Sequence, residues 1–242
     1  MLVASLTACG GGGGGGGNSS IGGGSAAVSY KFVPPVQGQW QTYAATVTDV
    51  GNNSGTYSYT DTITQVNADG SYSLSSEPSG GVAKYTLDGN NYIIDPYTDE
   101  YDSKGQIIQS HDTTMSASDI CIAAYPSGGM PSTVTQGQSW DDTHSWTCQG
   151  HADGNSGGIV TLLGAESVTV TAGTFSAYKF QEVVVMPDAS GPGVTTTTTT
   201  TWRNASATDS RALKISALTA VTGRTPPASQ IQASNWELIS YK

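Results

Sequence analysis

The side chains most able to do chemistry lie close together near the middle of the chain. His144, Cys148 and His151 are spaced as metal ligands often are, and Cys121 could supply a fourth ligand. Such a site would exist only while both cysteines are reduced, because a disulfide offers no thiolate to a metal. A metal-binding protein is therefore one hypothesis, but the ligand set is incomplete and we expect no metal or other cofactor.

Ser156 belongs to the same region, within Gly-Asn-Ser-Gly-Gly at residues 154–158, which resembles the nucleophile motif of chymotrypsin-like serine proteases. Such a nucleophile needs a histidine base and a carboxylate that orients the base. The surroundings of His111, His144 and His151 do not resemble the histidine motif of that family. We therefore predict a glycine-rich loop with no catalytic residues. A hydrolase or metal-binding protein that uses this loop is the alternative.

The amino-terminal residues indicate where the protein works. The sequence Leu-Thr-Ala-Cys, which ends at Cys9, resembles the lipobox of bacterial lipoproteins, in which the cysteine becomes the lipid-modified first residue. Eight glycines follow at 10–17, and no charged residue precedes Lys31. We interpret residues 1–8 as the remnant of a signal peptide. Residues 9–30 are interpreted as a lipidated Gly/Ser-rich tether, because such sequences behave as flexible coils.

The segment before Cys9 is short for a secretory signal, which needs a basic region and an apolar stretch of about 7–15 residues. We interpret Met1 as an internal or misassigned start; a chance lipobox beside a low-complexity tract is the alternative. The resemblance implies diacylation of Cys9, including palmitate, and stable anchoring takes more than one lipid chain. In proteobacterial lipoproteins an aspartate after the cysteine often signals inner-membrane retention. Gly10 stands there instead, which favours the outer membrane of the cell envelope.

Cys121 and Cys148 form an even pair once Cys9 is assigned to lipidation. Exported chains meet an oxidising environment, so we expect a disulfide between these two residues. Closing that loop would stabilise the fold by about 3–4 kcal/mol on the chain-entropy estimate. Two free thiols are the alternative.

The composition excludes several classes of partner. Only 12% of residues are charged and the net charge is −10, which argues against nucleic-acid binding and against electrostatic docking on anionic lipid. Twelve Tyr and five Trp stand against three Phe, and these amphipathic rings suit strands with one apolar and one wet face. No apolar run after the tether approaches the roughly 20 residues of a membrane-spanning helix.

Alternation of side chains predicts an all-β fold. Tyr57, Tyr59 and Ile63 share one face of a strand whose other face carries serine and threonine, and residues 56–76 are typical of a hairpin. Further strands are expected at residues 39–50, 83–87, 92–94, 106–108, 159–163, 167–171, 177–185, 194–202, 213–220 and 235–241. We expect residues 31–242 to form a single domain, an antiparallel meander folded as a sandwich or as an open or half barrel.

Seven consecutive threonines occupy residues 195–201. Threonine is β-branched and favours strands, and Val194 and Trp202 bracket the run as a strand would be bracketed. We predict an edge strand, or a strand polar on both faces. A disordered or O-glycosylated tract is the alternative.

A second resemblance covers the carboxyl-terminal third of the chain. Residues 167–180 resemble the V-x-V-P-A-G-T-F-x-A-x-K-V hairpin of many β-rich bacterial lipoproteins and periplasmic proteins. Trp202 and the Glu-Leu-Ile-Ser-Tyr sequence at 237–241 match later strands of those proteins in order. Thr171 replaces the proline, and residues 204–211 replace a glycine-rich turn. The resemblance implies a β-sheet fold and supplies no catalytic residues.

We therefore predict a noncatalytic, lipid-anchored envelope lipoprotein that is not an enzyme. Its expected partners are the membrane, through lipid on Cys9, and a glycan, an apolar ligand or another envelope protein, but not nucleic acid. Ligand contacts are expected on a sheet face or in a sheet concavity. The candidates are the aromatic side chains of Trp40, Tyr57, Tyr59 and Trp202, for each of which packing in the core is the alternative.

Overall fold

The structure is a computed structural model that describes residues 28–80, 83–87, 89–112, 120–149, 154–187, 192–206 and 208–242. Cys9, the tether and His151 lie outside these residues, so the predictions made for them stay predictions.

Strands and their connections make up the described part of the chain, which confirms the all-β prediction. In chain order the strands are β1 (Ser29–Tyr30), β2 (Trp40–Asp49), β3 (Ser54–Val66), β4 (Tyr72–Pro78), β5 (Ala83–Leu87), β6 (Asn90–Ile94), β7 (Tyr97–Tyr101), β8 (Ile107–Asp112), β9 (Ile120–Ala124), β10 (Val134–Thr135), β11 (Ser139–Asp141), β12 (His144–Cys148), β13 (Gly154–Ser156), β14 (Ile159–Val170), β15 (Gly173–Pro187), β16 (Val194–Asn204), β17 (Ala212–Thr222) and β18 (Ile231–Tyr241). Within these residues, no helix is long and apolar enough to cross a membrane.

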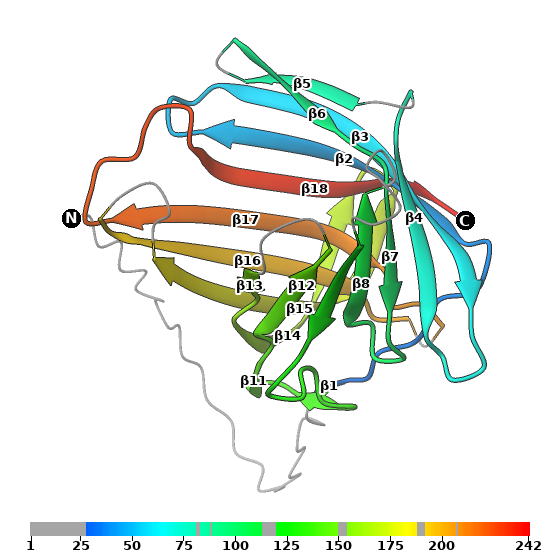
Figure 1. Ribbon diagram of the computed structural model, residues 1–242. Helices are drawn as coiled ribbons and strands as arrows, with labels where there is room; N and C mark the ends of the chain where they lie inside the picture. Colours follow the sequence, from blue (N-terminus) through cyan, green and yellow to red (C-terminus); the bar gives the residue numbers. More distant parts are fainter. Residues whose placement is uncertain are drawn as a thin grey trace, which may run out of the picture.

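One large sheet dominates the fold (Figure 1). Fourteen strands pair in the order β11-β14-β15-β16-β17-β18-β2-β3-β4-β7-β8-β9-β12-β13, and every neighbouring pair is antiparallel. Most sheet neighbours also follow one another in sequence, as expected of a meander. The sheet curls strongly without closing into a barrel, and β5–β6 and β1–β10 form two small additional sheets.

Side chains alternate along each strand, so each strand has one row of side chains on each face of the sheet. The row on the concave side forms the core. Tyr59 of β3 lies opposite Tyr43 of β2, and their rings stack with centroids 5.4 Å apart. The buried side chains form three clusters: Tyr30, Phe32, Ile63, Tyr72, Leu74, Val134, Leu162 and Phe180; Tyr43, Val168, Val170, Ala177, Leu213 and Leu238; and Val47, Tyr85 and Leu87.

Residues 139–149 and 154–161 form the two sides of a bent hairpin that joins the two ends of the sheet. Its β11 and β14 parts lie at one end, whereas β12 pairs with β9 at the other. At the bend the Asp142 N–H donates to the Gly158 carbonyl at 2.8 Å. A side chain at Gly157, whose φ is +80°, would collide with the Asp142 carbonyl, and one at Gly158 would collide with the Val183 carbonyl. The glycine-rich loop predicted here is therefore a strand–bend–strand segment.

The threonine run forms a strand with threonine on both faces, as one form of the prediction has it, whereas the other form, an edge strand, is wrong. β16 pairs along its length with β15 on one side and with β17 on the other. Both neighbours are at least as long as β16, so they satisfy its backbone on both sides, and its side chains are half-buried. A further difference concerns the separate strands predicted at residues 159–163 and 167–171. One strand, β14, runs from Ile159 to Val170 with an irregularity between Leu162 and Gly164, and residue 171 lies in the turn that follows.

Candidate functional site

Two cavities lie on the concave side of the sheet. The large cavity measures about 340 Å³ and the small cavity about 240 Å³. Phe32, Tyr101, Gly105 and Arg203 line both, so they form the wall between the two. The large cavity is lined by Tyr30, Phe32, Tyr101, Lys104, Gly105, Gln106, Ile107, Tyr125, Met130, Trp140, Asp142, His144, Ser156, Gly157, Val160, Phe180, Glu182, Thr201 and Arg203.

Aromatic rings make the apolar wall of the large cavity. The Tyr30 ring meets Phe180 edge-on with centroids 4.9 Å apart, and Trp140 meets Phe180 edge-on at 6.1 Å. Edge-to-face rings hold one another in place, and each buries a large apolar area. The wall is therefore a preformed surface, which a flat or apolar ligand group could contact without first ordering the side chains.

Arg203 of β16 projects its guanidinium between the two cavities. Its Nη1 donates to the Ser210 carbonyl at 3.2 Å, and no carboxylate in the described part of the chain forms an ion pair with it. A guanidinium has five N–H donors and stays protonated at all physiological pH values. Arg203 therefore keeps donor capacity directed at the cavities.

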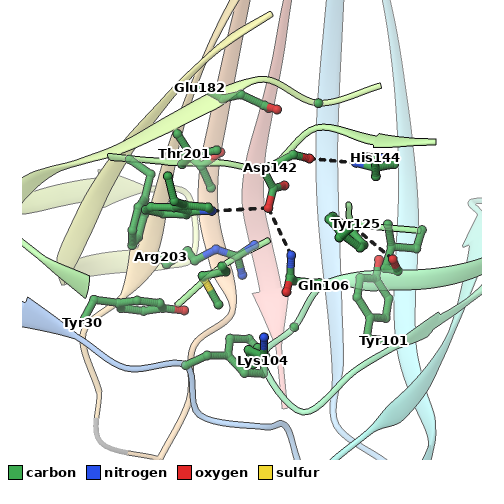
Figure 2. A pocket seen from close by; sticks show the side chains of 18 of the residues that line it. Tyr30, Tyr101, Lys104, Gln106, Tyr125, Asp142, His144, Glu182, Thr201 and Arg203 are labelled. Atoms are coloured by element: carbon green, nitrogen blue, oxygen red, sulfur yellow. Dashed lines mark hydrogen bonds between the residues drawn. The ribbon is translucent and has the colours of Figure 1, made fainter. Parts of the chain in front are cut away.

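Two carboxyl groups, from Asp142 and Glu182, lie on the opposite side of the large cavity from Lys104 (Figure 2). The Asp142 carboxylate accepts hydrogen bonds from Gln106 Nε2 at 3.2 Å and from Trp140 Nε1 at 3.3 Å. Burial raises the pKa of Asp142. Burial also raises the pKa of Glu182, and the nearby Asp142 charge raises it further. Burial is the largest cause of both shifts, and it outweighs the opposing charges of His144 and Arg203 at Asp142 and of His144 at Glu182.

His144 and Ser156 are brought together, as Cα partners on β12 and β13, and both line the large cavity. The His144 Nδ1 lies 3.0 Å from the Asp142 carbonyl oxygen. Because a carbonyl only accepts, Nδ1 must carry a proton. Ser156 is exposed, and no hydrogen bond joins its hydroxyl to the His144 ring among the described residues. The pair therefore lacks the contact through which a histidine activates a serine nucleophile.

A disulfide joins Cys121 and Cys148, whose Cα atoms lie 4.0 Å apart on the neighbouring strands β9 and β12. In this oxidised form neither sulfur is a thiolate ligand. In the part of the chain that the structure describes, no three His, Cys, Asp or Glu side chains are grouped so as to hold a metal ion. His151, the remaining ligand of the metal hypothesis, lies outside that part.

The four aromatic candidates have different surroundings. Trp40 and Tyr59 line the small cavity. Tyr57 packs in the interior, where its ring stacks on Tyr59 and its hydroxyl accepts from Trp236 Nε1 at 3.2 Å. Trp202 lines neither cavity; its Nε1 donates to Glu166 at 2.6 Å. The structure thus brings two of the four to a cavity.

The small cavity contains an unusual acid. Asp61 is only 8% exposed, and its Oδ1 is buried without a hydrogen-bond partner in the described structure. Its Oδ2 lies 3.5 Å from Gln41 Nε2. Burial raises the pKa of Asp61 to about 6. Arg211 also lines this cavity, with its Nε paired to Asp209 and its buried Nη1 unpartnered.

The charged side chains Asp61, Arg203 and Glu182 were not predicted as site residues from the sequence. For Asp61 a signal existed, because it occupies the same strand face as Tyr59 and Ile63, where a carboxylate is unexpected. For Arg203 and Glu182 no comparable signal existed. Both sit on strands without clear alternation, and only the curl of the sheet brings them to one cavity.

The chain was compared with known proteins by sequence and by structure. No protein-family model matches the chain, and no curated protein sequence matches it. Among solved structures, a Bacteroides fragilis protein described as exported, with a YmcC-like fold, aligns with a TM-score of 0.44 at 12% identity, covering 90% of this chain and all of that one. A Parabacteroides distasonis protein described as a lipoprotein aligns with a TM-score of 0.46 at 10% identity, covering 87% of this chain and 97% of that one. At these similarities neither assigns an activity, and the functional argument rests on the residues above.

Proposed function

We propose that this protein is a lipid-anchored, noncatalytic binding protein of the bacterial cell envelope, and that its ligand is a small molecule held in the large cavity. The observation that carries the proposal is the cavity itself, which combines an aromatic wall with a guanidinium that has unused donors. Ligand sites of this kind are concave, mostly apolar, and fitted with a few oriented polar groups. The lipobox resemblance at Cys9 supports the envelope location.

The hydrolase alternative is less well supported. Its nucleophile, Ser156, is exposed and makes no hydrogen bond to His144, and the His144 Nδ1 is already committed to a backbone carbonyl. Hydrolysis by this pair would need a rearrangement of β12 against β13. Binding needs none, because the walls of the large cavity are formed by side chains already in contact.

The proposal can be tested by filling the cavity. Thr201 lines the large cavity, whereas Thr200, its neighbour on the same strand, points to the opposite face and lines neither cavity. We would compare Thr201→Trp with Thr200→Trp in protein that also carries Cys9→Ser. The probe is 8-anilinonaphthalene-1-sulfonate, which combines aromatic rings with an anionic group and reports binding by fluorescence.

The unsubstituted and Thr200→Trp proteins should bind the probe saturably at one site, and Thr201→Trp should weaken binding at least tenfold. Thermal unfolding of both variants should remain cooperative, which separates a filled cavity from a loosened fold. Equal binding by Thr201→Trp and Thr200→Trp would place the probe elsewhere and contradict the proposal, as would the lack of saturable binding to the unsubstituted protein.

A further inference from the structure

We infer that the large cavity selects an amphoteric small molecule, with an oxyanion at Arg203, a protonated amine at Asp142 and Glu182, and an apolar group against the aromatic wall. This inference rests on the proposed function and names the chemical class of its ligand. Three features of the cavity carry it: the basic groups of Lys104 and Arg203, the acids Asp142 and Glu182 across the cavity from Lys104, and the aromatic wall (Figure 2).

The basic side consists of Arg203 and Lys104. A buried cation is costly unless it is paired, and Arg203 makes one hydrogen bond to a neutral carbonyl and no ion pair with a described carboxylate. The planar guanidinium fork matches the two oxygens of a carboxylate or the oxygens of a phosphate. Lys104 lines the same side and adds a second positive charge. A ligand oxyanion would meet both.

Tyr30 lines the large cavity near Arg203 but offers no donor to a ligand there. It is 2% exposed, and its hydroxyl oxygen is buried, with no hydrogen bond of good geometry to a described residue. Burial raises the pKa of Tyr30, while Arg203 and the adjacent Ser210 hydroxyl lower it. The ligand oxyanion is therefore assigned to Arg203 and Lys104 alone.

The acidic side consists of Asp142 and Glu182, which lie close enough for each charge to disfavour the other. Gln106 and Trp140 hold the Asp142 carboxylate in place by donating to its Oδ1. Neither donor carries a charge; the charges of His144 and Arg203 act on Asp142 and that of His144 acts on Glu182, but no described cation forms an ion pair with either acid. A protonated ligand amine would supply the missing positive charge. A ligand with only an anion would meet repulsion here, so the cavity as a whole favours a molecule with both charges.

The test uses small ligands that differ only in charge. Phenylalanine and alanyl-phenylalanine place an amine and a carboxylate at two different separations beside an aromatic ring. Each would be compared with its N-acetyl derivative, which lacks the amine charge, and with its C-terminal amide, which lacks the carboxylate. Affinities would be measured by calorimetry and by displacement of the anilinonaphthalene probe from the full chain carrying Cys9→Ser.

At least one of the two zwitterions should bind, and both of its blocked derivatives should bind about tenfold more weakly or worse, because each loses a charge-assisted contact. An N-acetyl derivative that binds as well as its parent would overturn the amine contact with Asp142 and Glu182. An amide that binds as well as its parent would overturn the carboxylate contact with Arg203. If the probe occupies the cavity but neither zwitterion displaces it, the inference is wrong while the proposed function stands. If the probe does not bind in the cavity, both are wrong.

Two variants assign the contacts. Glu182→Gln should weaken binding of the zwitterion about tenfold, whereas the N-acetyl derivative should bind as well as before or better because one repelling charge is gone; this contrast isolates the contact between Glu182 and the amine. Glu100→Gln, an exposed position on β7 that lines neither cavity, is the matched control and should change neither affinity. Arg203→Lys keeps the positive charge but loses the paired N–H donors of the planar guanidinium. It should therefore weaken binding of the zwitterion and of the N-acetyl derivative to the same extent. Equal effects of Glu182→Gln on both ligands would contradict the assigned contact.

Discussion

Replacing Asp61 by asparagine should stabilise the protein at neutral pH. The Asp61 carboxyl is 8% exposed and its Oδ1 has no hydrogen-bond partner in the described structure. Burial is the largest cause of its raised pKa, because the rings that line much of the small cavity do not solvate a negative charge, and the long contact from Gln41 compensates only in part. Asparagine has nearly the same shape and carries no charge, so the substitution removes the desolvation cost while preserving the packing.

The magnitude follows from the pKa. Burial raises the pKa of Asp61 to about 6, against 3.8 for the ordinary carboxyl, and each tenfold change in proton affinity corresponds to about 1.4 kcal/mol. The folded protein therefore holds this proton more tightly than the unfolded chain. Below the pKa that Asp61 has in the unfolded chain, the carboxyl is protonated in both states and does not destabilise the fold. As pH rises from about 4 to about 6, the buried charge lowers the free energy of unfolding progressively, until the loss is complete above about pH 6. At pH 8 it amounts to about 3 kcal/mol, and at pH 4 to less than about 1 kcal/mol.

Urea unfolding of the unsubstituted and Asp61→Asn proteins at pH 4 and pH 8 measures this difference. The variant should be more stable by about 3 kcal/mol at pH 8 and nearly equal at pH 4. Asp69→Asn is the control, because Asp69 is exposed and hydrogen bonds from Ser71 lower its pKa, so that substitution should not stabilise the protein. The reasoning is refuted if Asp61→Asn destabilises at pH 8, or if its effect is the same at both pH values.

Three further changes test other parts of the structure. Gly157→Ala should lower the free energy of unfolding by about 1–3 kcal/mol, because the residue has positive φ and its new Cβ would meet the Asp142 carbonyl. Replacing both Cys121 and Cys148 by serine should lower it by about 3–4 kcal/mol, from the 27-residue separation that the disulfide closes. Cys9→Ser, expressed with any upstream segment, should move the protein from the detergent phase to the aqueous phase and remove the lipid mass.

For each of these three predictions, a specific result would contradict it. Gly154→Ala is the control for Gly157→Ala, because a Cβ there meets no atom within 4 Å, and equal losses would refute the argument from the bend. Alkylation of Cys121 and Cys148 without reductant would show free thiols and favour the metal hypothesis again. A mature amino terminus other than Cys9, without lipid mass, would refute the lipobox assignment.

The fold class was predictable because strand periodicity is local. The tyrosines of β3 alternate with small polar residues, and that pattern needs only one pleated strand with one face on a core. The position of a strand in the sheet is not local. The threonine run 195–201 carries no sign that β15 and β17 flank it, so its prediction as an edge failed although its prediction as a strand held.

The candidate site was predictable only in part, for the same reason. His144 and Ser156 were singled out by their chemistry, and the structure places both on the wall of the large cavity. Arg203 shares a strand face with Thr201, and two features make that face part of a cavity wall: β15 and β17 flank β16, and the bent hairpin brings β12 round to face β15 and β16. Long-range pairing decides both features, and a single sequence contains no direct record of it.

The central claim is that the large cavity binds a small molecule, and a crystal structure with the anilinonaphthalene probe bound tests it most directly. The account predicts the probe inside the large cavity, with its rings against Trp140 and Phe180 and its sulfonate within hydrogen-bond distance of Arg203. Density for the probe on the outer face of the sheet, with the large cavity empty of it, would contradict the account.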